Sequence, residues 1–138
     1  MALICDTGPL YAALDRNDKH HQRCARMFEA ADEVIVVPAP VVVELDWLVG
    51  NRLSFDAFDA FLTDVETGAI RVEELRPIDY SRVRAICRRY VDLPLGFVDA
   101  AVVAVAERLK EARVASLDHR HFSVVRPAHV QAFELVPS

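Results

Sequence analysis

Short apolar segments that alternate with longer helical patterns constrain the fold of this chain more than any other feature of its sequence. The apolar segments consist mostly of Val, Ile, Leu and Ala, and five of them are predicted strands: residues 3–6, 33–38, 69–75, 113–118 and 133–137. Strands separated by helices along the chain tend to pair in parallel, and a parallel sheet needs helices on both faces. We therefore expect an α/β fold with a mainly parallel central sheet of four to five strands.

Six segments between these strands carry helical patterns. They are residues 8–16, 21–31, 40–53, 54–68, 81–93 and 95–112. Pro9 suits the first turn of the first helix, and Ser54 and Gly68 suit the beginning and the end of the fourth. The fourth helix also carries an apolar stripe, which is expected to pack into the core or to serve a dimer. The stripe consists of Phe55, Phe58, Phe61, Leu62 and Val65.

Size and cysteine content narrow the class of protein. The 138 residues suit one domain, expected to span residues 1–138, and the hydrophobic content of 53% indicates a globular chain. The three cysteines, Cys5, Cys24 and Cys87, show no zinc-binding spacing, which predicts core thiols in a reduced, cytoplasmic protein. No segment has the length of a membrane span or the pattern of a signal peptide.

Four acidic residues stand among apolar neighbours that do not suit an acid. Asp6 follows ALIC, Glu44 interrupts PVVVELDWLV, Asp99 opens VDAAVVAVA, and Asp118 follows VASL. Each neighbourhood is expected to be buried or half-buried, where an unpaired carboxylate is costly and its pKa rises. Asp6 and Asp118 also lie where strands end, at the edge where parallel α/β sheets bind ligands. Together the four acids predict a functional site.

Carboxylates gathered in one place need a compensating cation, and their chemistry selects it. Carboxylate oxygens suit Mg²⁺ or Mn²⁺, whereas zinc would want histidine or cysteine. Mg²⁺ is usually completed by substrate phosphates, so the four acids indicate phosphodiester chemistry. Thr7 could offer its hydroxyl to a metal-bound water or to the phosphate. The net charge of −5 does not exclude a nucleic-acid substrate, because setting these four aside leaves 17 of the 21 acidic residues against 16 basic ones.

Three of the four acids also have ordinary structural explanations. Asp6 or Thr7 could cap the first helix, and Asp99 would lie near the first turn of its helix, where the helix dipole favours a negative charge. Asp118 could be a turn residue at the end of a strand. Neither a helix cap nor the helix dipole explains Glu44, because it is expected in the middle of a helix with apolar residues on both sides.

Other families share parts of this pattern. Asp6-Thr7-Gly8 matches the catalytic tripeptide of aspartic proteases, but those enzymes pair two Asp carboxylates in Gly-rich all-β chains, and this chain has four glycines and long helical patterns. A haloacid-dehalogenase-type phosphatase would need a second Asp at position 8. A non-enzymatic, Mg²⁺-binding receiver domain would need an acid pair after the first strand and a lysine after a late one. Here Cys5 precedes Asp6, and His119 and Arg120 follow Asp118.

Four segments resemble, in order and spacing, the motifs of PIN-domain ribonucleases, and most closely those of VapC toxins from bacterial toxin–antitoxin pairs. The segments are ICDTGPLYAALD, PAPVVVEL, DLPLGFVDAAVVAVAERL and SLDHRHF, and the likeness spans nearly the whole chain. The resemblance implies a parallel three-layer α/β/α sandwich and an Mg²⁺- or Mn²⁺-dependent endoribonuclease. The acidic positions of the family fall on Asp6, Glu44, Asp99 and Asp118, with Thr7 after the first.

The resemblance also implies partners and a substrate. Family members usually act on tRNA or ribosomal RNA, form homodimers, and are silenced by a cognate VapB-type antitoxin. An inactive PIN fold that only scaffolds a partner is a further alternative, against which the four intact acids argue.

Basic residues near the acids are candidates for RNA contact. Arg88 and Arg89 precede the third acidic motif, and His119 and Arg120 follow Asp118. Cations of this kind contact phosphates, and no aromatic RNA-binding motif is present, so the shape and backbone of the RNA are the expected determinants. Asp92 precedes Asp99 by seven residues. We expect it to cap a helix or to support the site from outside.

Overall fold

A computed structural model of the chain describes residues 1–138 and contains a five-stranded sheet in which all neighbouring strands are parallel. The strand order β3-β2-β1-β4-β5 places the first strand of the chain at the centre. The predicted α/β fold with a parallel central sheet is therefore confirmed. The strands are β1 Ala2–Cys5, β2 Val34–Pro38, β3 Ile70–Glu73, β4 Arg113–Ala115 and β5 Glu134–Val136.

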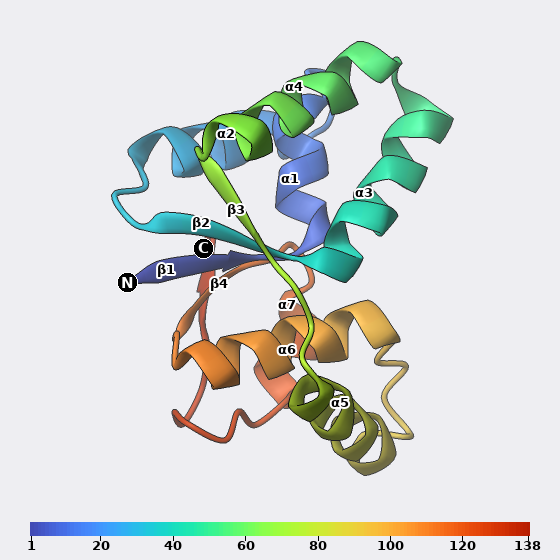
Figure 1. Ribbon diagram of the computed structural model, residues 1–138, viewed down its shortest axis with the longest axis vertical. Coiled ribbons are helices and arrows are strands. Elements are labelled where there is room, and N and C mark those ends of the chain that lie inside the picture. The colour runs from blue at the N-terminus through green and yellow to red at the C-terminus, as the bar shows by residue number, and fades with distance from the viewer.

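Helices cover both faces of the sheet, which gives the expected three layers. Helices α1 to α4 lie on one face, and α5 and α6 lie on the other, with α7 beside α6 (Figure 1). Their bounds are α1 Thr7–Leu14, α2 His21–Ala30, α3 Ala39–Arg52, α4 Phe55–Thr67, α5 Pro77–Arg89, α6 Phe97–Leu109 and α7 His119–Val124. Helix α7 was not predicted. In α6, residues 100–106 are all buried, because small and branched side chains let this helix pack closely between the sheet and α5.

The apolar stripe of α4 is only partly a core feature. Phe58 and Phe61 are buried, and their rings stack with centroids 5.7 Å apart. Phe55 is 67% exposed and Leu62 is 37% exposed. The predicted end of the helix is confirmed, since Gly68 follows α4 with φ of 88°, a left-handed conformation that glycine adopts without a steric cost.

The cysteines lie where thiols act as small apolar side chains. All three are free, Cys5 and Cys24 are buried, and Cys87 packs at the edge of the core. Burial raises the pKa of the Cys5 thiol, which keeps it protonated and unreactive. No helix of this structure combines the length and the apolar character needed to cross a membrane.

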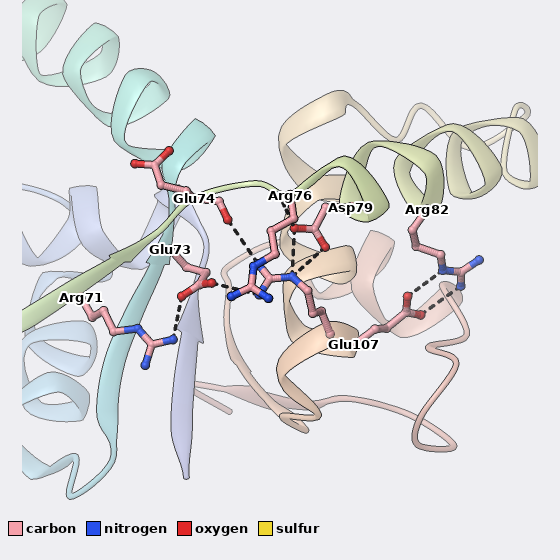
Figure 2. A network of polar contacts seen from close by, with 8 residues as sticks. Arg71, Glu73, Glu74, Arg76, Asp79, Arg82 and Glu107 are labelled. Carbon is pink, nitrogen blue, oxygen red and sulfur yellow. Dashed lines mark hydrogen bonds and ion pairs between the residues drawn. The ribbon is translucent and has the colours of Figure 1, made fainter.

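A network of charged side chains ties the end of β3 to α5 and α6 (Figure 2). Asp79, which is buried, accepts a hydrogen bond from the Arg76 backbone N–H at 2.9 Å and so stabilises the start of α5. Arg108 of α6 donates to both carboxylate oxygens of Asp79 at 3.0 Å and to Glu73 at 3.0 Å. The network therefore fixes the position of α6, the helix that carries Asp99.

Replacing Arg82 by methionine should lower the free energy of unfolding by about 1–3 kcal/mol. Arg82 donates two hydrogen bonds to Glu107, at 2.6 and 2.9 Å, and the Glu107 side chain is only 9% exposed. Methionine keeps the packing of the aliphatic stem but leaves this carboxylate without its cation. Urea denaturation measures the loss. Arg84→Met is the matched control, since Arg84 is exposed on the same helix and forms no ion pair; an equal loss in both variants would contradict the prediction.

Candidate active site

The carboxyl edge of the sheet brings two of the predicted acids together around a buried serine. Asp6 follows β1 directly, and its Oδ2 accepts a hydrogen bond from the Ser116 hydroxyl at 3.0 Å. The same Ser116 oxygen accepts a hydrogen bond from the backbone N–H of Asp118 at 3.0 Å. Ser116, which the sequence analysis missed, therefore orients the Asp6 side chain and the Asp118 backbone together. Its position near the end of the predicted strand 113–118, two residues before Asp118, was the available signal.

Gly8 allows the segments carrying these two acids to approach closely. A Cβ atom at Gly8 would lie 3.3 Å from Leu117 Cβ, which is closer than nearly all real Cβ contacts. The Asp6 backbone N–H also donates to the Ala115 carbonyl at 2.9 Å, which continues the β1–β4 pairing up to the site. The glycine of the Asp6-Thr7-Gly8 tripeptide thus serves the packing of the α1 N-terminus against the loop after β4.

Asp99 and Asp118 form the densest cluster of potential metal ligands, together with His121. One ligand atom from each of the three residues lies within 4.8 Å of the other two. Asp99 is the third residue of α6, in its first turn as expected. Asp118 is the N-cap of α7, and its Oδ1 accepts the His121 backbone N–H at 3.1 Å. Asp118 is thus a helix cap, whereas its structural alternative was a turn residue at the end of a strand, and it is also a member of this cluster.

The electrostatics of Asp6 and Asp99 indicate uncompensated negative charge. Burial raises the pKa of Asp6 from 3.8 to about 7, with repulsion by Asp99 and Glu44 adding to the rise and hydrogen bonds from the Thr7 N–H and Ser116 opposing it. Burial is also the main cause that raises the pKa of Asp99, followed by the charge of Asp118. Desolvation therefore contributes more than crowding, and both effects favour the uptake of a cation.

Glu44 differs from its predicted environment. The expectation that it is buried or half-buried is wrong, because its side chain is exposed on α3. Helix α3 buries Val41, Leu45 and Val49. Val43 and Trp47 therefore lie on the solvent side of the helix, together with Glu44. Glu44 is still close enough to the other acids for its charge to raise the pKa values of Asp6 and Asp99. It therefore lies at the open side of the site.

The four acids lack lysine and arginine partners within the chain. Neither lysine nor arginine forms an ion pair with any of them, and His121 is the sole basic side chain in contact. The buried Thr7 hydroxyl, adjacent to Asp6, has no hydrogen-bond partner. Unpaired carboxylates and an orphaned hydroxyl together fit a divalent cation with its bound water, since each group would then find a partner.

The predicted RNA-contact residues lie on two helices. Arg88 and Arg89 are exposed in the last turn of α5, where the Arg89 guanidinium lies 5.4 Å from the centroid of the Tyr90 ring. Arg120 is exposed in α7, and His119 is the first residue of that helix and half-buried. None of them contacts the four acids directly, so a role for them depends on a ligand large enough to reach both regions.

Asp92 lies in the turn after α5 and is exposed. It is no ligand of the Asp99 cluster and makes no side-chain hydrogen bond.

An apolar groove lies beside the site, with a volume of about 680 Å³. Glu44 is one of its lining residues, and the exposed side chains of Val43, Trp47, Tyr80 and Phe97 form much of the rest.

Comparison with known proteins identifies a family and a fold. The PIN domain family model matches residues 3–126. Ribonuclease VapC26 of Mycobacterium tuberculosis is 32% identical over 135 residues, which cover 98% of this chain and 100% of the relative.

Solved structures agree with this match. The crystal structure of Mycobacterium tuberculosis VapC20, described as a Sarcin-Ricin loop cleaving toxin, superposes with a TM-score of 0.83 at 21% identity, over 94% of this chain and 98% of that one. VapBC2 from Rickettsia felis, bound to a DNA fragment from its promoter, gives a TM-score of 0.71 at 12% identity, over 98% of both chains. At these identities the two structures establish a shared fold.

Proposed function

Since this chain belongs to the PIN-domain family, and within it to the VapC group, we propose that it is a metal-dependent endoribonuclease that acts as the toxin of a type II toxin–antitoxin pair. The observation that carries the proposal is the gathering of acids from four distant segments, without lysine or arginine partners, at one edge of a parallel sheet. Such a site suits hydrolysis of a phosphodiester bond.

Asp6, Glu44, Asp99 and Asp118 would hold Mg²⁺ or Mn²⁺. The ion, when bound, supplies an activated water and offsets negative charge on the phosphate and the leaving oxygen. The hydrogen bonds from Ser116 and from the α7 N-terminus orient the carboxylates of Asp6 and Asp118 before any ligand arrives. This preorganisation reduces the free-energy cost of assembling the site.

The exposed and the buried acids would have different tasks. Glu44 is the acid that solvent reaches most freely, so its carboxylate is the one we assign to accept a proton from the attacking water. Asp6 is held in place by Ser116 and shielded from solvent, which suits a fixed ligand. The Thr7 hydroxyl would donate its free hydrogen bond to the phosphate or to a bound water.

The substrate we propose is structured RNA, either tRNA or ribosomal RNA. Arg120, His119, Arg88 and Arg89 would contact its phosphates, and their separation over two helices suits a folded RNA better than a short strand. The VapC20 toxin, which shares this fold, is described as cleaving the Sarcin-Ricin loop.

A VapB-type antitoxin is the proposed protein partner, in the cytoplasm, with the toxin as a homodimer. The structure of VapBC2 from Rickettsia felis includes both members of such a pair. The groove beside Glu44 leaves Val43 and Trp47 exposed by 70% and 65%, and a second copy of the chain would cover them. Light scattering on the purified toxin measures the mass of the assembly.

Removal of divalent metal should abolish RNA cleavage, and Mn²⁺ or Mg²⁺ should restore it. The reason is that the acids then repel one another and have no other cation in the chain. The measurement is cleavage of total tRNA and of ribosomal RNA on denaturing gels, in EDTA and after addition of each metal. Cleavage that persists in EDTA would contradict the metal site. Metal binding without cleavage under any condition would instead favour the inactive PIN scaffold.

A further inference from the structure

His121 places a ring nitrogen among the acids of the site. Its Nδ1 lies 2.6 Å from Asp118 Oδ2 and 4.0 Å from Asp99 Oδ2. Donor atoms bound to one octahedral ion are separated by roughly 3 Å when adjacent and roughly 4 Å when opposite, because each bond is about 2.1 Å long. The 4.0 Å separation is close to that of opposite ligands of one ion, and the 2.6 Å separation, that of an ion pair, is somewhat shorter than that of adjacent ligands.

A structural role alone does not explain why His121 Nδ1 is buried without a hydrogen bond. Nδ1 is buried and has no partner with hydrogen-bond geometry, although it lies near Asp118. The Asp118 backbone N–H already donates to the Ser116 hydroxyl, and its carboxylate already accepts the His121 backbone N–H. A buried polar atom without a hydrogen bond is costly, so an additional partner is expected.

We propose that His121 Nδ1 is a direct ligand of the metal and that it makes the site prefer Mn²⁺ over Mg²⁺. This inference rests on the proposed metal-dependent function and specifies its cofactor. It adds one nitrogen to the oxygen ligands supplied by Asp99 and Asp118. The ligands expected from the sequence were acids alone, and His121 stood there only as part of the motif SLDHRHF.

The preference follows from the chemistry of the two ions. Mg²⁺ is a hard ion that binds carboxylates and water and gains little from imidazole. Mn²⁺ accepts the same oxygens but, as a transition metal, also binds imidazole nitrogen. Asp118 and His121 lie three positions apart on one helical turn, so α7 presents both donors together.

Metal binding in the absence of RNA tests the inference without reliance on activity. Isothermal titration of the metal-free protein should show tighter binding of Mn²⁺ than of Mg²⁺. His121→Gln should lower the Mn²⁺ affinity by about 10–100-fold and the Mg²⁺ affinity by about threefold or less. His20→Gln is the matched control: this histidine lies at the start of α2, outside the ligand cluster, so both affinities should remain as in the wild type.

Pulsed EPR of the Mn²⁺-loaded wild type gives a readout that needs no variant. A nitrogen hyperfine coupling from a directly bound imidazole is expected, and it should be lost in His121→Gln and kept in His20→Gln. Absence of this coupling, or an equal loss of affinity for both metals in His121→Gln, would overturn the role of His121 while leaving the nuclease proposal intact. A wild-type protein that binds neither metal would overturn the metal-dependent function itself.

Discussion

Asp99→Asn should lower the rate of RNA cleavage by about a thousandfold. Asp99 is half-buried beside Asp118 and His121, and its charge also acts on Asp6. Asparagine keeps the size of the side chain but removes the negative charge that would bind the metal. A metal contributes several kcal/mol of transition-state stabilisation, and about 1.4 kcal/mol corresponds to a factor of ten in rate. Single-turnover cleavage of the RNA substrate measures the loss.

The matched control for this substitution is Asp59→Asn. Asp59 is exposed on α4, on the opposite face of the sheet from α6, and its side chain makes no hydrogen bond. The same change of charge there should leave the cleavage rate within about twofold of the wild type. The assignment of Asp99 fails if both variants cleave RNA at the wild-type rate.

The second large effect is on the free energy of unfolding: removal of the Asp6 charge should stabilise the metal-free protein. In metal-free protein at pH 8, Asp6→Asn should raise the free energy of unfolding by on the order of 4 kcal/mol while abolishing cleavage. The reason is that the pKa of Asp6 is about 7 in the folded protein and near 3.8 in the unfolded chain. At pH 8 the folded wild type must therefore hold an ionised carboxylate in a buried position.

The pH dependence follows from the same pair of pKa values. Between pH 3.8 and about 7 the folded protein keeps a proton that the unfolded chain releases, so wild-type stability falls as the pH rises through this range. The advantage of Asp6→Asn should thus be largest above pH 7 and shrink towards pH 4. Urea denaturation in EDTA at several pH values measures this difference. A constant difference over the whole range, or a less stable variant at pH 8, would contradict it.

Addition of Mn²⁺ should stabilise the wild type more than the variant and narrow this difference, which closes when the free metal reaches about 1,000 times its Kd. Binding to the folded state alone stabilises the wild type, whereas the variant lacks one of the ligands. The acid that we propose as a fixed metal ligand is therefore also the acid that destabilises the metal-free fold. A trade-off of this kind is expected where charges are gathered for function.

Much of the fold could be predicted from the chain because its signals are local. Each predicted strand is a short apolar run, and Gly68 ends α4 through a conformation that glycine favours. The buried part of α6 is apolar over a full run of residues, so its position against the sheet follows from composition. Helix α7 was missed because six residues carry too little periodicity, and its main signal is the cap provided by Asp118.

The site was less predictable because it depends on directions that only the tertiary structure sets. Apolar neighbours suggested that Glu44 is buried, but Val43 and Trp47 are themselves exposed, so the neighbours carried no information about its environment. Ser116 and His121 are common residue types whose contacts with acids appear only after β1 and β4 pair.

The bond between Ser116 and Asp6 spans 110 residues, and this separation has a consequence for when the protein becomes dangerous to its host. During synthesis, β1 leaves the ribosome long before β4, and pairing of such distant segments is a late and slow event in folding. A nascent chain that already contains Asp6 and Glu44 has no site, because Asp99, Ser116 and Asp118 have yet to be made. The proposed ribonuclease therefore gains its activity only after nearly the entire chain has been released, which leaves an interval in which a partner already present can capture it.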